Sequence, residues 1–120
     1  MVILFDQYNL PDSIYEVVFA TDQQRIVSAL LIKHIKENKG QLNKSQMSKF
    51  ATELHDGKIV HQGQKISYNK RQFYDRILTP MKAMGLVNYD MYKRIYSLSK
   101  NFASALQKVA DMWLEEYSKS

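Results

Sequence analysis

Apolar residues recur at helical spacing between about Asp22 and Asn38, which predicts the first helix of the chain. Thr21, followed three residues later by Gln24, fits a capping box at the start of this helix. Gly40 then supplies the left-handed turn that commonly closes a helix. The apolar stripe of this helix consists of Ile26, Val27, Leu30, Leu31 and Ile35.

A second helix is predicted from about Lys44 to His55, with Asn43 as its N-cap. Leu42 before the cap and Met47 at the fourth helical position match a hydrophobic staple. The apolar positions repeat at the spacing of one helix face: Met47, Phe50, Ala51 and Leu54.

A third helix is predicted from Tyr68 to Met84, with Ser67 as its N-cap. Pro80 removes one backbone hydrogen bond, so we expect a kink there, or a helix that ends near Leu78 and restarts. The side of the helix expected to face the core carries Phe73, Ile77, Met81 and Met84. The side expected to point outward carries Tyr68, Arg71, Gln72, Asp75, Thr79 and Lys82.

Gly85 stops the third helix, and two short segments then favour antiparallel strands. These segments are Leu86–Tyr89 and Arg94–Leu98, joined by a tip at Asp90–Lys93. A final helix is predicted from about Asn101 to Tyr117. Its apolar stripe consists of Phe102, Leu106, Val109, Ala110, Trp113 and Tyr117.

Two segments are ambiguous. In the first twenty residues, Val2–Phe5 is typical of a buried strand, whereas Ile14–Phe19 fits either a strand or a short helix, with a turn at Pro11 and Asp12 between them. Residues 58–66 place β-branched pairs on either side of a Gln-Gly turn candidate. They predict either a small hairpin or an irregular loop.

A chain of 120 residues is long enough for one domain with a single apolar core. It contains no cysteine, which excludes disulfides and thiolate metal sites and favours an intracellular location. The apolar start, Met1–Phe5, is interrupted by Asp6 and is too short for a signal peptide or a membrane span. We therefore expect a soluble, cytoplasmic protein that does not bind a membrane.

The formal net charge of +5 is unevenly distributed along the chain. Residues 1–24 carry four acidic and no basic residues, a net charge of −4. Residues 25–64 hold seven basic and three acidic residues, or +4, and residues 65–108 hold nine basic and two acidic residues, or +7. The last twelve residues contribute −2. The positive charge thus gathers at the third helix and the strands, as a polyanion-binding surface requires, although Lys and Arg also serve simply to solvate a helical surface.

Two motifs resemble a known family of DNA-binding proteins. Leu78-x-x-Met81-x-x-Met84-Gly85-Leu86-Val87 resembles the end of a recognition helix, and Tyr96-Ser97-Leu98-Ser99 resembles the returning strand of a wing. Over about residues 22–117 the chain is similar to the winged-helix transcription regulators of the MarR and PadR type, found in bacteria and archaea. The resemblance implies a mainly α fold with a small β-hairpin wing (α+β), a winged helix-turn-helix with an additional C-terminal helix. It implies one domain over residues 1–120: an N-terminal segment (1–20), a winged-helix core (21–100) and a C-terminal helix (101–120).

The same resemblance implies sequence-specific binding of double-stranded DNA and a role in transcription regulation. Helix 68–84 would read the major groove, and wing 88–96 would contact the backbone or the minor groove. Arg71 and Gln72 are the candidates for base contacts, because Arg pairs with guanine and Gln with adenine through two hydrogen bonds. Lys70, Arg76, Lys93 and Arg94 are the candidates for phosphate contacts. The complete candidate set is Tyr68, Asn69, Lys70, Arg71, Gln72, Asp75, Arg76, Lys93 and Arg94.

The chain departs from the family in one respect, because twelve residues lie between His55 and Tyr68 where a short turn is usual. This insertion is either an arm that adds phosphate contacts through Lys58 and Lys65 or simply a longer loop. The resemblance also implies a homodimer built by the terminal helices. Trp113 and Tyr117 are candidates for that interface, with core packing inside the monomer as the alternative.

No enzyme signature appears, since the chain lacks a Gly-rich phosphate loop, a nucleophile elbow and an acid pair. We therefore expect no catalytic residues and no cofactor. His34, His55 and His61 lack the third ligand and the regular spacing of a zinc site, so no metal site is expected.

The main alternative function is a winged-helix protein–protein interaction module of a transcription or replication assembly. The acidic N-terminal segment, with Tyr8, Ile14 and Tyr15, would then be the contact surface. Charge discriminates between the two functions, because a protein-binding module has no need of a net +7 across its third helix and wing. Related regulators also bind small molecules between their DNA-binding and dimer helices, but no sequence feature here marks such a pocket.

Overall fold

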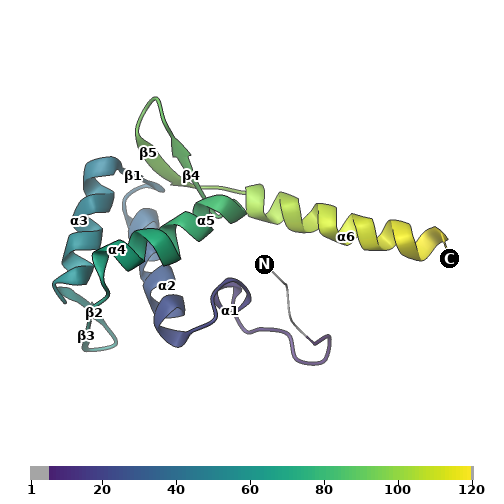
Figure 1. The fold of residues 1–120 in the computed structure, drawn as a ribbon, viewed down its shortest axis with the longest axis horizontal. Coiled ribbons are helices and arrows are strands. Elements are labelled where there is room, and N and C mark those ends of the chain that lie inside the picture. Colours follow the sequence, from purple (N-terminus) through teal and green to yellow (C-terminus); the bar gives the residue numbers. More distant parts are fainter. Residues whose placement is uncertain (1–5, 120) are drawn as a thin grey trace.

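The computed structural model describes residues 6–119 as a mixed α+β fold, shown in Figure 1. Its helical segments are α1 (Ile14–Val18), α2 (Asp22–Glu37), α3 (Lys44–His55), α4 (Lys70–Gln72), the π-helical segment η1 (Phe73–Leu78), α5 (Thr79–Met84) and α6 (Asn101–Lys119). Its strands are β1 (Gln41–Asn43), β2 (Ile59–His61), β3 (Gln64–Ile66), β4 (Val87–Asp90) and β5 (Ile95–Leu98). One antiparallel sheet has the order β1-β5-β4, and β2 pairs with β3 in a second sheet.

Helices α2 and α3 confirm the predicted ones to within a residue, because both begin at side chains that cap them. The hydroxyl of Thr21 accepts the N–H of Gln24 at 3.2 Å. The amide oxygen of Asn43 accepts the N–H of Gln46 at 2.7 Å, and the side-chain oxygen of Gln46 accepts the N–H of Asn43 at 2.8 Å. This reciprocal pair satisfies two N–H groups that the first turn of α3 leaves without a partner.

The sequence analysis missed strand β1, which is too short to show an alternating pattern. It pairs with β5, placing Leu42 opposite Tyr96 and Asn43 opposite Ile95. The N–H of Lys44 then donates to the carbonyl oxygen of Arg94 at 3.1 Å. The start of α3 is therefore attached to the end of the β4–β5 hairpin.

Residues 58–66 form the hairpin that the sequence allowed. Ile59 pairs with Ile66, and His61 pairs with Gln64. Gln62 and Gly63 between the strands have φ angles of 51° and 78°. Positive φ at both central residues matches the twist of a two-residue hairpin turn.

The start predicted for the third helix is wrong by two residues. Helix α4 begins at Lys70, and its N-cap is Asn69 instead of Ser67. The Ser67 hydroxyl donates to the carbonyl oxygen of His55 at 3.2 Å, and the N–H of Tyr68 donates to the carbonyl oxygen of Leu54 at 3.1 Å. These bonds hold residues 67 and 68 against the end of α3, so the helix begins only after them.

Pro80 does not end the helix, because helical backbone angles continue through Leu78 and Thr79. The alternative in which the helix ends near Leu78 and restarts is therefore wrong, and Figure 1 shows one continuous coil from α4 to α5. The irregularity takes the form of η1, a π-helical stretch just before the proline. Pro80 has no N–H for the carbonyl of Arg76 and its ring crowds that carbonyl, which accounts for the change in hydrogen bonding.

The apolar core lies between α2, α3 and the α4–α5 helix, with β1, β4 and β5 along one side. His34 stacks on Phe50 with ring centroids 5.1 Å apart, and Phe50 contacts Phe73 at 5.6 Å. The fully buried residues include Val27, Leu31, Ile35, Leu42, Met47, Leu54, Phe73, Ile77, Leu78, Met81 and Val87. Helix α1 confirms the helical alternative for residues 14–19, whereas the strand predicted at residues 2–5 lies outside the described residues.

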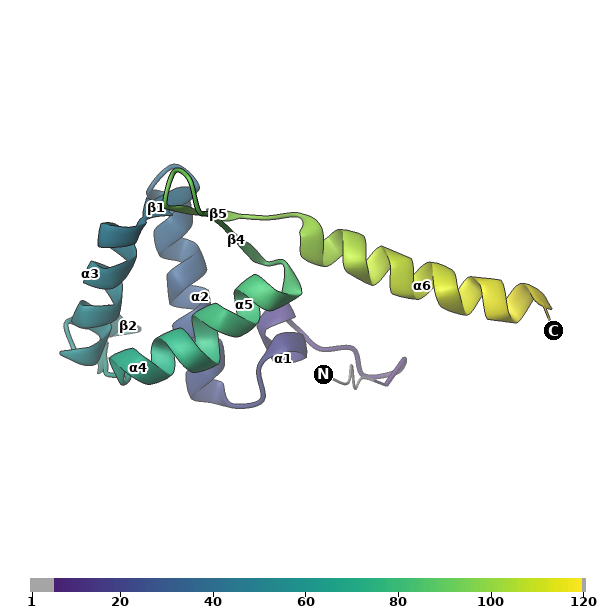
Figure 2. The same cartoon turned by 45° about the horizontal axis from the view of Figure 1, so that its top comes forward.

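Helix α6 projects away from this core in both Figure 1 and Figure 2. Phe102 is its one buried residue, and Trp113 is 67% exposed. The alternative in which its apolar stripe packs inside the monomer is therefore wrong for the described chain. The radius of gyration, 16.3 Å, exceeds the value of about 14 Å typical of a compact chain of this length. Within residues 6–119, no helix combines the length and the apolar character needed to cross a bilayer.

Candidate functional site

The outward face of α4 and η1 carries four exposed polar residues from the predicted site: Arg71, Gln72, Asp75 and Arg76. The side chain of Arg71 is 91% exposed, and that of Asp75 is 67% exposed. The Nε of Arg71 lies 3.8 Å from a carboxylate oxygen of Asp75, one helical turn further along. Such an exposed pair contributes at most about 1 kcal/mol, so the guanidinium is available to a ligand.

Asn69 and Lys70 instead hold α4 on α3. The Asn69 side chain accepts the N–H of Gln72 at 3.1 Å, which caps the helix. The ammonium of Lys70 donates to the hydroxyls of Thr52 at 2.9 Å and Ser48 at 3.3 Å, and its backbone N–H donates to Nδ1 of His55 at 3.0 Å. Two N–H groups at the start of α4 are thus already used by the protein itself.

Tyr68 does not belong to the outward face. Its side chain is 6% exposed and belongs to the apolar core cluster. This burial corrects the prediction that Tyr68 contacts DNA. The prediction that Tyr68 points outward assumed a helix that begins at residue 68, whereas Tyr68 precedes the helix.

The tip of the β4–β5 hairpin is a well-bonded turn over residues 91–94. The Asp90 carboxylate accepts the N–H groups of Tyr92 at 2.9 Å and Lys93 at 3.0 Å. The N–H of Arg94 donates to the carbonyl oxygen of Asp90 at 2.7 Å. The side chains of Lys93 and Arg94 are both exposed at this tip.

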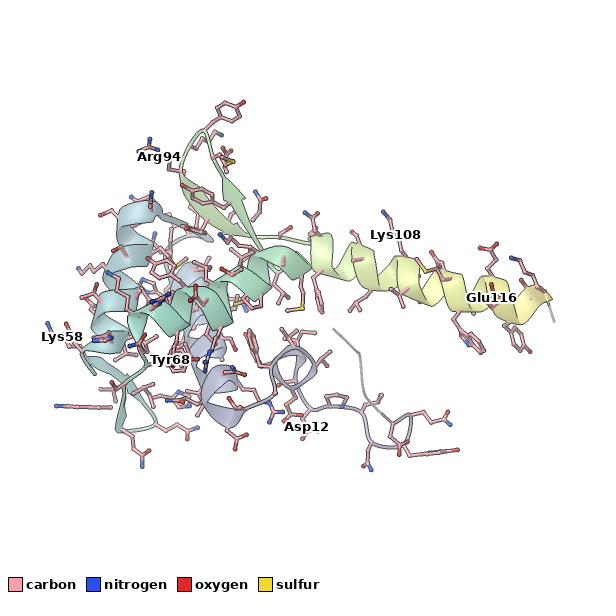
Figure 3. All side chains as sticks on the ribbon, in the orientation of Figure 1. Asp12, Lys58, Tyr68, Arg94, Lys108 and Glu116 are labelled. Atoms are coloured by element: carbon pink, nitrogen blue, oxygen red, sulfur yellow. The ribbon has the colours of Figure 1, made fainter. Side chains whose placement is uncertain are left out.

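A groove of about 750 Å³ runs along the outer face of α3, from the hairpin tip to the start of β2. Figure 3 shows Arg94 and Lys58 at opposite ends of α3. The groove carries four basic and two acidic residues together with three hydroxyls. It is lined by Lys44, Ser45, Ser48, Lys49, Thr52, Glu53, Asp56, Lys58 and Arg94.

The sequence analysis assigned no role to Lys44 and Lys49, because their positions fit the ordinary polar face of a helix. Lys44 lies one helical turn before Ser48, and Lys49 lies one helical turn before Thr52. This spacing, which places cations and hydroxyls on one face, was the signal that the sequence offered. Lys58 from the insertion does line the groove, whereas Lys65 is not among its lining residues.

A cluster of aromatic rings and one cation joins α5 to the hairpin. The ammonium of Lys82 lies 5.9 Å from the ring centroid of Tyr89 and 6.0 Å from that of Tyr96. Burial, reinforced by the neighbouring Tyr74 and Tyr89, raises the pKa of Tyr96 above its ordinary value. The phenol of Tyr96 is therefore neutral near pH 7, and the charge of Lys82 is not offset by it.

Among the described residues, no three His, Asp or Glu side chains gather in a way that would hold a metal ion. His34 packs against Phe50, and His55 is engaged with Lys70.

Neither a protein-family model nor a curated protein matches this chain, and no solved structure is significantly similar to it.

Proposed function

We propose that this chain is a winged helix-turn-helix protein that binds double-stranded DNA and regulates transcription. The α4–α5 helix would enter the major groove, and the β4–β5 hairpin would lie against the backbone or the minor groove. The order α2, β1, α3, β2, β3, α4–α5, β4, β5, with β1 beside β5, supports this assignment.

The observation that carries the proposal is the combination of an exposed polar helix face with a basic hairpin tip. Arg71 and Gln72 are exposed on α4, and each offers two parallel hydrogen bonds of the kind that read guanine and adenine. Arg76, Lys93 and Arg94 are also exposed and supply charges for phosphates. Asp75 lies one helical turn from Arg71, and its carboxylate oxygen is 3.8 Å from Nε of Arg71.

Fluorescence anisotropy with a labelled duplex of random sequence, repeated over a series of salt concentrations, tests the proposal. We expect binding at low salt that falls steeply as salt rises, because phosphate contacts release counterions. Selection of bound sequences from a random duplex pool is expected to return a defined motif. Absence of binding at low salt would reject the proposal and favour the protein-binding alternative.

We also propose that the protein is a homodimer joined through α6. The helix exposes Val109 (51%), Met112 (62%), Trp113 (67%) and Leu114 (58%). A contiguous exposed apolar surface of this kind marks an interface, and a two-fold symmetric dimer is the commonest way to cover one. A symmetric dimer also presents two equivalent DNA-reading helices, as palindromic sites require.

A further inference from the structure

The outer face of α3 connects the two parts of the molecule that are proposed to touch DNA. At its start, the N–H of Lys44 is bonded to Arg94 of the hairpin tip, and at its end, Nδ1 of His55 is bonded to Lys70 of α4. The 12 residues of α3 give it a length of about 18 Å. Helix α3 therefore links the hairpin tip to the start of α4 through one hydrogen bond at each end.

The groove on this face carries four basic and two acidic side chains, a formal net charge of +2, and within residues 6–119 its cations are not held in ion pairs. None of Lys44, Lys49 and Arg94 forms an ion pair within 4.0 Å with any residue that the structure describes, and the same holds for Lys58. Hydroxyls of Ser45, Ser48 and Thr52 line the groove between these charges. The ammonium of Lys70 reaches the last two hydroxyls from the neighbouring helix.

Arg94 occupies the groove at an energetic cost. Its φ angle is 56°, in the left-handed region, where a residue with a Cβ is disfavoured by about 1–2 kcal/mol. Glycine would adopt this conformation at lower cost. This turn places the side chain of Arg94 in the lining of the groove.

We propose that this groove binds the phosphodiester backbone of one DNA strand, an inference that rests on the proposed DNA-binding function. The groove follows α3 for about 18 Å, which is several times the axial rise of about 3.4 Å between successive phosphates of one strand. Lys44 and Arg94 hold the strand at the hairpin end, and Lys49 holds it near the middle of α3. Glu53 and Asp56 lie toward the opposite end of α3, where their carboxylates repel phosphates, so the strand is held mainly toward the hairpin end.

Removing single groove cations tests the inference. We expect Lys44→Ala and Lys49→Ala each to lower the slope of log K against log salt by about 0.9, and the double variant by about 1.8. Preference among base sequences is expected to stay unchanged, since phosphate contacts do not read bases. Lys108→Ala is the matched control, because Lys108 is an exposed lysine on α6, outside the groove (Figure 3), and its removal is expected to leave the slope unchanged.

A variant of opposite sign strengthens the test. Glu53→Gln removes a negative charge from the groove and keeps the shape of the side chain, so we expect duplex affinity at low salt to rise about two- to fivefold. Circular dichroism of each variant shows that the fold is retained.

The possible failures are distinguishable. If the wild-type protein binds no duplex, the proposed function falls, and this inference falls with it. If the wild type binds a duplex, but Lys44→Ala and Lys49→Ala show the same slope of log K against log salt as Lys108→Ala, the groove assignment is overturned. The proposed DNA binding would then still stand. Competition by an acidic peptide as effective as that by a duplex would likewise overturn the assignment to a phosphate backbone.

Discussion

At the start of α4, the immediate neighbours of each side chain decide whether it is free to meet a ligand. Tyr68 is buried, Asn69 caps the helix, and Lys70 is hydrogen-bonded to α3. Arg71 and Gln72, the next two residues, are exposed. The predicted base-reading residues thus remain available, while three residues immediately before them serve the structure.

Arg71→Ala tests base reading by a single side chain. We expect the variant to lose preference at one base position, at a cost of about 1–3 kcal/mol for the preferred duplex, without loss of fold stability. Competition anisotropy against duplexes with single base-pair changes measures this. Arg76→Ala, which is predicted to lose a phosphate contact, should weaken all duplexes alike. Equal behaviour of the two variants would contradict the roles assigned here.

Substitutions at Arg94 separate its charge from its backbone conformation. Both Arg94→Gly and Arg94→Ala should lower the salt slope of DNA binding by about 0.9, because each removes one phosphate contact. Glycine relieves the positive φ angle and alanine does not, so Arg94→Gly should be more stable than Arg94→Ala by about 1 kcal/mol. Urea denaturation measures the difference, and equal stabilities would show that the turn is unstrained.

At the scale of elements, the insertion between α3 and α4 closes on itself. The residues on either side of it stay together, since Ser67 bonds to His55 and Tyr68 bonds to Leu54. The β2–β3 hairpin therefore extends from the turn without separating α3 from α4. The connection of twelve residues therefore leaves the end of α3 beside the start of α4.

Gly85 joins three elements, and Gly85→Ala tests that junction. The glycine ends α5 with φ of 87°, and its carbonyl accepts the N–H of Phe102 at 3.0 Å. A Cβ there would lie 2.8 Å from the backbone nitrogen of Phe102 and 2.9 Å from Cβ of Asn101. We expect the free energy of unfolding to fall by about 2–4 kcal/mol, from backbone strain and overpacking together.

Gly40→Ala is the matched control for this junction. Gly40 has a similar φ of 85°, but a Cβ there meets nothing within 4 Å. Its substitution should cost only the backbone strain, about 1–2 kcal/mol in urea denaturation. Similar losses at both glycines would show that contact with α6 adds nothing at Gly85.

At the scale of the whole molecule, the described chain divides into a packed core and a projecting arm. The core holds α2, α3, the α4–α5 helix and the three-stranded sheet, whereas α6 extends beyond it (Figure 1). The principal extents of 55, 36 and 23 Å reflect this shape. An exposed apolar helix on such an arm is suited to a second copy of the chain, as proposed above.

Trp113 is the one tryptophan of the chain, which makes the proposed dimer directly measurable. We expect its fluorescence to shift to shorter wavelength as protein concentration rises, because dimerisation removes the indole from water. Light scattering should give twice the monomer mass of 14.1 kDa. Val109→Asp should abolish both effects by placing a charge in the apolar interface.

Ser104→Asp is the control for the dimer, since Ser104 lies on α6 about 200° around the helix from Phe102 and is exposed. The variant should dimerise like the wild type. A wild-type mass near 14.1 kDa at micromolar concentration would contradict the dimer.

The amino-acid sequence by itself determined α2, α3, α6 and the β4–β5 hairpin, because their signals lie within a few consecutive residues. The caps at Thr21 and Asn43, and the stripes that face the core, depend only on local spacing. Residues 70–84 were recognised as helical for the same reason, including the apolar side formed by Phe73, Ile77 and Met81.

Only the tertiary structure decided the strand β1, the burial of Tyr68, the exposure of α6 and the groove on α3. Three of these depend on a partner distant in sequence: β1 on β5, Tyr68 on the end of α3, and the groove on Arg94 near the start of α3. The exposure of α6 follows from its projection away from the core. The free energy that places these groups comes from burial and hydrogen bonds formed after the chain has folded back on itself, which no local pattern encodes.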